Sequence, residues 1–235
     1  DLDPHIDAWK VAESQGEVPG EAAIGWEKVA DSQFEGVTIG KYLLHHSRYL
    51  QMPLLLIHKS GNAGGPVLLW LGENGKATVA DWPAIAKYVE DGYSVLSFDP
   101  RGLGETRMPY KAASPDDPLL AQMDPEHAYA YPLLGVLADY VYNSLLVGRP
   151  YLFQTIEDAE IATRFFRAAV RPDAKFFVAG SEGAAPLASA IAETLPDMKL
   201  VPEASDRPLR WSEIVDQKTE LWPIQYLLPG GAYIH

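Results

Sequence analysis

The sequence predicts one α/β domain, residues 1–235, with a mostly parallel central sheet flanked by helices. From Gly36 onward, short β-rich runs alternate with segments of helical periodicity, which is the pattern of strands joined by helical crossovers. Residues 67–71, VLLWL, are apolar without a break, as expected of a strand buried on both faces. The length of 235 residues also suits a single domain. We expect residues 1–35 to be an N-terminal extension and residues 108–150 to be a cap-like insertion.

The first half of the chain predicts strands and one well-delimited helix. Residues 42–47 and 52–65 are typical of two strands closed by a glycine-rich turn, and residues 66–72 of a buried strand. Residues 81–92, DWPAIAKYVEDG, predict a helix with an aspartate cap, a proline in its first turn and a glycine at its end. Residues 93–99 predict the next strand, which leads into the loop PRGLGET, whose glycines allow a sharp reversal.

Two local interactions are predicted in the middle of the chain. Asp99 and Arg101 flank the start of the loop PRGLGET, and we expect them to form a buried ion pair that shapes this turn. A helix is predicted over residues 155–170, where apolar residues repeat at helical spacing. Thr155 and Asp158 stand in the order of a capping box at its start.

A strand, a small-residue turn and a helix follow at residues 174–195. The order AKFFVA, GSEG, APLASAIAETL is typical of a nucleophile elbow, in which a tight turn presents one side chain above the sheet. Residues 179–183, AGSEG, fit an A-x-S-x-G variant of this motif, with Ser181 at the tip. In the alternative register, GSEGA, the tip residue is Glu182. We favour Ser181, and Glu182 remains the second candidate.

In these segments the chain resembles the α/β-hydrolase superfamily and, within it, the bacterial acetylxylan-esterase-like proteins. The resemblance rests on the ordered segments VLLWL, GENGKA, SFDPRGLGET, GRPYLFQTIEDAEIATRFF, the elbow and WPIQYLLPGG. It extends from about Tyr42 to the C-terminus. It implies the α/β-hydrolase fold, incomplete at its C-terminal end in this sequence.

The resemblance also implies acyl transfer by a serine nucleophile. Ser181 Oγ would attack an ester carbonyl, a histidine would accept the Ser181 proton, and an acid would orient that histidine. The oxyanion would be held by the backbone N–H of Glu182 and by one from the loop near Glu73 and Asn74.

The sequence departs from the family pattern after the elbow. The family order is serine, acid, histidine, but His235 is the only histidine after Ser181, and Asp206 and Asp216 are the aspartates placed to support it. A terminal histidine is a poor general base because chain ends fray. We therefore expect either that His235 serves as base or that the acid and histidine belong to a further C-terminal segment.

Three other histidines are candidates only outside the family order. His127 lies in DPEHAYA, and His45 and His46 are adjacent in a predicted strand. Neighbouring strand residues point to opposite faces, so His45 and His46 do not suit one metal ion. For all three, the favoured interpretation is ordinary packing or surface exposure.

Composition excludes several classes of function. The net charge of −13 disfavours binding to nucleic acid and to anionic membranes. The absence of cysteine excludes disulfides and thiolate metal sites. GENGKA lacks the residues of a phosphate-binding loop, and no metal or cofactor is expected.

The sequence therefore predicts a serine carboxylesterase that hydrolyses acetyl or other esters, on carbohydrate by the resemblance. The alternative is a degenerate, non-catalytic α/β-hydrolase-like domain with a binding or structural role. A secreted or periplasmic location is expected from the resemblance alone. The substrate and the oligomeric state are not indicated.

Overall fold

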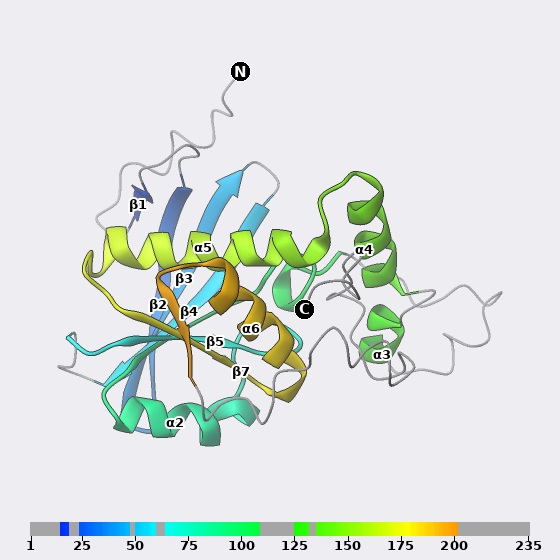
Figure 1. Cartoon of the computed structure of the whole chain (residues 1–235). Coiled ribbons are helices and arrows are strands. Elements are labelled where there is room, and N and C mark those ends of the chain that lie inside the picture. The colour runs from blue at the N-terminus through cyan, green and yellow to red at the C-terminus, as the bar shows by residue number, and fades with distance from the viewer. Residues whose placement is uncertain are drawn as a thin grey trace.

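A computed structural model gives the fold. It describes residues 15–18, 24–47, 50–59, 64–108, 125–131 and 135–201. The described strands form one eight-stranded sheet in the order β1-β2-β3-β4-β6-β5-β7-β8 (Figure 1). The strands are β1 Gln15–Val18, β2 Ile24–Phe34, β3 Val37–Ser47, β4 Leu50–Lys59, β5 Val67–Leu71, β6 Ser94–Phe98, β7 Phe176–Gly180 and β8 Met198–Leu200.

Helices cover both faces of this sheet. The α-helices are α2 Trp82–Glu90, α3 Pro125–Ala130, α4 Val136–Leu146, α5 Tyr151–Ala169 and α6 Ala185–Thr194. The short 3₁₀ helices among the described residues are η1 Val79–Asp81, η2 Gly104–Thr106 and η4 Glu182–Ala184. Helices α5 and α6 lie on one face and α2 on the other (Figure 1). This arrangement confirms the predicted α/β fold class.

The sheet is mixed, because an antiparallel half precedes the parallel half. Strands β6, β5, β7 and β8 are parallel to one another, and β1 to β4 pair antiparallel, with β4 antiparallel to β6. Strands β1 and β2 lie within residues 1–35, where the sequence predicts no strand. A two-residue turn joins β2 to β3 with positive φ at both Glu35 (48°) and Gly36 (80°), as a type I′ hairpin requires.

The central strands are buried on both faces, as the continuous apolar run predicts. In β5, Val67, Leu69 and Leu71 pack in the cluster beneath α5 and α6. Leu68 and Trp70 pack in the opposite cluster beneath α2. A third cluster joins α3 and α4 to the loop after β6 and to the start of α5.

The capping-box interpretation at Thr155 is wrong, because α5 begins four residues earlier, at Tyr151. Pro150, just before the helix, is not helical (φ −48°, ψ 138°). Thr155 is already inside the helix, and its hydroxyl donates to the carbonyl of Leu152 (2.8 Å). Asp158 faces the interior and is fully buried. The Asp158 carboxylate therefore contacts another part of the fold and does not cap the helix.

The helix over residues 81–92 is present as α2, with proline in its first turn. The Asp81 carboxylate does not cap α2 itself. It accepts hydrogen bonds from the Thr78 N–H and hydroxyl, both at 2.8 Å, and so closes η1.

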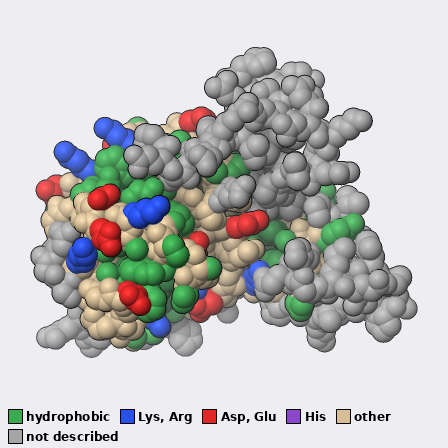
Figure 2. All heavy atoms as spheres, turned by 90° about the horizontal axis from the view of Figure 1, so that it is seen from below, with side chains coloured by type: hydrophobic (Ala, Val, Ile, Leu, Met, Phe, Trp, Pro, Cys, Tyr) green, Lys and Arg blue, Asp and Glu red, His purple; other side chains and the backbone are tan. Residues whose placement is uncertain are grey.

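The outer surface on the α2 side of the sheet carries charges of both signs. Figure 2 shows acidic and basic side chains interspersed among apolar ones on this face. In the part of the chain that the structure describes, no helix has the length and apolar character needed to cross a membrane.

Candidate active site

Three loops meet at the carboxyl edge of the parallel strands, where open α/β sheets place their ligand sites. Residues 72–76 follow β5, residues 99–107 follow β6, and residues 181–184 follow β7. Since β5 lies between β6 and β7, the first loop is flanked by the other two.

The predicted strand–turn–helix is formed at Ser181. The Ser181 N–H donates to the Leu71 carbonyl (2.9 Å) and extends the pairing of β7 with β5. The Ser181 carbonyl accepts from the Ala184 N–H (2.9 Å) and starts η4. A Cβ at Gly180 would lie 3.0 Å from both the Leu71 carbonyl oxygen and Ala184 Cβ, so the turn requires a small residue there. Ser181 itself is half-buried.

The backbone of Ser181 is nevertheless not in the left-handed region. A nucleophile elbow holds its serine in a sharp, strained turn. Among the described residues, Glu35 is the non-glycine residue with a positive φ, so the φ of Ser181 is not positive. The chain enters α6 through the 3₁₀ turn of η4 instead.

The loop after β5 presents a backbone donor to the serine. The Glu73 N–H donates to Ser181 Oγ at 3.1 Å. This loop is closed by paired hydrogen bonds between Gly72 and Gly75, at 3.1 and 3.4 Å. A Cβ at Gly183 would lie 2.6 Å from Glu73 Oε2, so the Glu73 side chain packs directly against η4. The structure thus brings together Ser181 and a backbone donor from the loop near residues 73 and 74, where one of the two oxyanion donors is expected.

Asp99, at the end of β6, joins the loops that follow β5 and β6. Its carboxylate is fully buried and accepts hydrogen bonds from the Lys76 N–H (2.7 Å) and the Glu105 N–H (3.1 Å). Lys76 Nζ forms ion pairs with Asp99 and Glu105. Burial opposes the charged ammonium of Lys76, but the hydrogen bonds to these two carboxylates outweigh it, so the pKa of Lys76 lies above its ordinary value.

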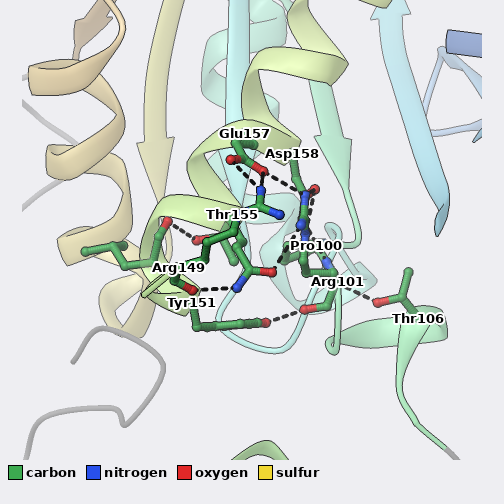
Figure 3. Close-up of polar contacts among 10 residues, drawn as sticks. Pro100, Arg101, Thr106, Arg149, Tyr151, Thr155, Glu157 and Asp158 are labelled. Atoms are coloured by element: carbon green, nitrogen blue, oxygen red, sulfur yellow. Dashed lines mark hydrogen bonds and ion pairs between the residues drawn. The ribbon is translucent and has the colours of Figure 1, made fainter. Parts of the chain in front are cut away.

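The prediction of an ion pair between Asp99 and Arg101 is wrong, because Arg101 binds Asp158 of α5 (Figure 3). Arg101 Nε lies 3.0 Å from each Asp158 carboxylate oxygen, and the Arg101 N–H donates to the same carboxylate at 3.0 Å. The Tyr151 hydroxyl donates to the Arg101 carbonyl. The turn after β6 reverses direction at this point, so Asp99 faces β5 and Arg101 faces α5.

Two adjoining clefts open beside this turn. One, of about 540 Å³, is lined by residues that include Gln51, Thr106 and Arg107. The other, of about 500 Å³, lies against α4, and the two share Met108 and Tyr140 in their walls. Ser181 lines neither cleft. They lie beside the β6 loop and the α4–α5 region.

The structure describes only part of the predicted catalytic set. Glu182 opens η4, and its side chain lies outside the described part of the structure, as does that of His127 on α3. His235, Asp206 and Asp216 also lie outside the described residues.

His45 and His46 are remote from Ser181. They lie on β3, four positions from β7 in the sheet, which corresponds to about 19 Å at the usual strand spacing. His45 is buried, with Nε2 3.8 Å from Glu27 Oε1, and burial lowers its pKa. Burial and then the charge of Arg101 lower the pKa of His46. Within the described residues, no three His, Asp or Glu side chains gather as a metal site.

Sequence reasoning missed the partners of Asp99 and Arg101. One signal was present: Asp158 lies one residue before Ala159, on the face of α5 that is buried in the core. A carboxylate on a buried helix face needs a cation or several N–H donors. No comparable signal in the sequence links Asp99 to Lys76.

Comparisons with known proteins identify the fold. No protein-family model matches the chain, and no curated protein matches it. Acetyl xylan esterase 1 from Thermoanaerobacterium sp. JW/SL YS485 superposes with a TM-score of 0.51 at 15% identity, covering 88% of this chain and 59% of that one. A protein described as a candidate acetyl xylan esterase from Bacteroides fragilis NCTC 9343 gives a TM-score of 0.51 at 15% identity, covering 76% of this chain and 46% of that one.

These likenesses show the fold, and the chain spans less than two thirds of the length of either protein. The chain therefore has the α/β-hydrolase fold that the sequence resemblance predicted.

Proposed function

We propose that this chain carries the nucleophile of a serine ester hydrolase, with Ser181 attacking acetyl or other esters on a carbohydrate. The observation that supports this proposal is the 3.1 Å hydrogen bond from the Glu73 N–H to Ser181 Oγ. It places a backbone donor beside the hydroxyl at the carboxyl edge of the parallel strands. In the structure this donor binds Oγ itself, and in acyl transfer a donor beside the nucleophile would instead have to bind the carbonyl oxygen that becomes negative.

The chemistry follows from this pair of groups. Ser181 Oγ would bond to the ester carbon while its proton passes to a histidine, and the carbonyl oxygen would become an oxyanion. That oxygen would come within reach of the Glu73 N–H, with the Glu182 N–H at the start of η4 as the second donor. The alcohol would then leave with the proton from the histidine, and water would hydrolyse the acyl-enzyme. The base would be His235, with Asp206 or Asp216 as its acid, or a histidine further along the full protein.

The second candidate is a non-catalytic α/β-hydrolase-like domain. The absence of a positive φ at Ser181 favours it, because known nucleophile elbows hold the serine in a strained turn. The Glu73 carboxylate beside Gly183 also adds negative charge close to the place where an oxyanion would form.

The test is covalent labelling of the full-length gene product with a fluorophosphonate probe, together with hydrolysis of p-nitrophenyl acetate. We expect Ser181→Ala to abolish labelling and to lower hydrolysis by at least about 10³-fold, since loss of a nucleophile removes the covalent route. Ser189→Ala is the matched control, because this α6 serine has a buried hydroxyl and should leave both signals unchanged. A folded full-length protein that takes up no probe would favour the non-catalytic candidate.

The remaining expectations stay predictions. They are a secreted or periplasmic location and the absence of nucleic-acid and membrane partners.

A further inference from the structure

Asp99 is the common anchor of the loops after β5 and β6. One carboxylate oxygen, Oδ1, accepts from the Lys76 N–H at 2.7 Å. The other, Oδ2, accepts from the Glu105 N–H at 3.1 Å and pairs with Lys76 Nζ. Each loop is therefore bound by its own backbone amide to its own oxygen of one buried side chain.

Two glycines allow both loops to close around this carboxylate. Gly75 (φ +127°) and Gly104 (φ +58°) have backbone conformations that favour glycine, and a Cβ on either would collide with Asp99. The loops thus pack against Asp99 without an intervening side chain. The position of the carboxylate fixes the path of both.

The loop after β5 also carries the donor that faces the serine. Glu73 lies between Gly72 and Gly75, which are hydrogen-bonded to each other, and Lys76 follows directly. The Asp99–Lys76 contact thus holds one end of a short closed loop whose other end continues from β5. Within this loop, the Glu73 N–H points at Ser181 Oγ.

We propose that Asp99 is a positioning residue for the ester hydrolysis, which orients the Glu73 N–H toward Ser181 by anchoring the loop after β5. This inference rests on the proposed function. Asp99 is not proposed to touch substrate. Its effect passes through the Lys76 N–H, the Gly72–Gly75 pairing and the Glu73 amide.

Asp99→Asn is the sharpest perturbation, because the structure uses both carboxylate oxygens as acceptors of backbone N–H groups. An asparagine amide has one acceptor oxygen and one NH₂ donor. Whichever way the amide is turned, one of the two loops faces a donor in place of its acceptor. The substitution therefore releases an anchor while it hardly changes the side-chain volume.

Asp158→Asn is the matched control. Asp158 is as buried as Asp99. It accepts a hydrogen bond from the backbone N–H of Arg101 and forms an ion pair with the Arg101 side chain. It lies on the α5 side of the same turn, away from the loop that carries Glu73. Its loss should lower stability without changing the orientation of the Glu73 N–H.

Two readouts on the full-length protein separate positioning from general destabilisation. The first is kcat per fluorophosphonate-labelled site, which removes the effect of misfolded molecules. For Asp99→Asn we expect a decrease of about 10- to 10²-fold with little change in KM, since the donor acts in the transition state. The second is amide hydrogen exchange of residues 72–76, which we expect to become at least about tenfold faster. Asp158→Asn should leave both values near those of the wild type.

The outcomes distinguish this inference from the proposed function. A wild-type protein without labelling or hydrolysis would refute the proposed function, while the exchange measurement would still show whether Asp99 holds the loop. Unchanged exchange in Asp99→Asn would overturn the inference in either case. Faster exchange with an unchanged kcat per labelled site would also overturn it. If Asp99→Asn does not fold, Lys76→Met removes only the Nζ contacts and should show the same two effects to a smaller degree.

Discussion

Replacing Arg101 with methionine should destabilise the protein strongly, because it leaves the Asp158 charge buried without its cation. The Asp158 side chain is fully buried. Of its contacts to Arg101, only the one from the backbone N–H would survive. Removing one partner of a buried ion pair costs about 3–5 kcal/mol. For a chain of this size, 1 kcal/mol corresponds to about 2–4 °C in Tm, so we expect a decrease of about 6–20 °C.

The pH dependence of this loss has a definite sign. Burial raises the pKa of Asp158, and Arg101 counteracts that effect, so the variant should have a still higher pKa at this carboxyl. A folded-state pKa above the unfolded value means that the folded state binds more protons, and stability then decreases as the pH rises. The penalty of Arg101→Met should therefore be smaller at pH 5 than at pH 7.

Thermal and urea unfolding of the wild type and three variants would measure these effects. Arg149→Met is the control within the same network, because its ion pair with Glu157 is largely exposed and should contribute less than about 1 kcal/mol. Arg101→Met combined with Asp158→Asn should recover part of the loss, since the unpaired charge is gone. An Arg101→Met penalty no larger than that of Arg149→Met would refute the claim that the pair is buried and unscreened.

Two further predictions concern backbone strain and acid stability. Gly148 has φ +72° and open space around it, so Gly148→Ala should lower the free energy of unfolding by about 1–2 kcal/mol. Gly104→Ala, at φ +58°, should lower it clearly more, because the added Cβ would collide with Asp99. Equal losses in urea unfolding would contradict this prediction. Burial lowers the pKa of His45, so the unfolded state binds more protons below about pH 6.5 and the free energy of unfolding decreases on acidification. His45→Gln should make the free energy of unfolding depend less on pH between pH 7 and 5. Parallel stability curves of the variant and the wild type would count against this prediction.

The parallel half of the sheet could be predicted from the sequence because its signals are local. The run VLLWL must be buried on both faces wherever it lies, and the small residues around Ser181 permit only a tight turn into a helix. The antiparallel half was predicted less well. Strand β2 has exposed or half-buried residues along most of its length, so it lacks the apolar run that revealed β5, and its turn at Glu35–Gly36 is not one of the commonest hairpin dipeptides.

The sequence predicts the parts of the candidate site that lie within a single segment of the chain. The motif around Ser181 locates the hydroxyl, and the position of the loop after β5 indicates a donor near Glu73. The contact of Asp99 with Lys76 joins residues 23 positions apart, and the contact of Arg101 with Asp158 joins residues 57 positions apart. A short-range rule pairs Asp99 with the nearest cation, Arg101. The fold instead directs the two side chains to different elements, and only the three-dimensional arrangement of β5, β6 and α5 determines which cation each acid meets.

The two buried acids at this edge are better explained by loop geometry than by stability. A buried ion pair contributes little over a well-packed apolar pair of the same volume, because desolvation offsets the Coulomb attraction. A carboxylate, however, accepts several N–H groups in fixed directions, which no apolar side chain can do. Asp99 binds backbone amides of two loops, and Asp158 binds the backbone amide of Arg101. Each acid thus fixes main-chain atoms across a gap between elements: Asp158 binds the turn after β6 to α5, and Asp99 binds that turn to the loop that carries the Glu73 N–H.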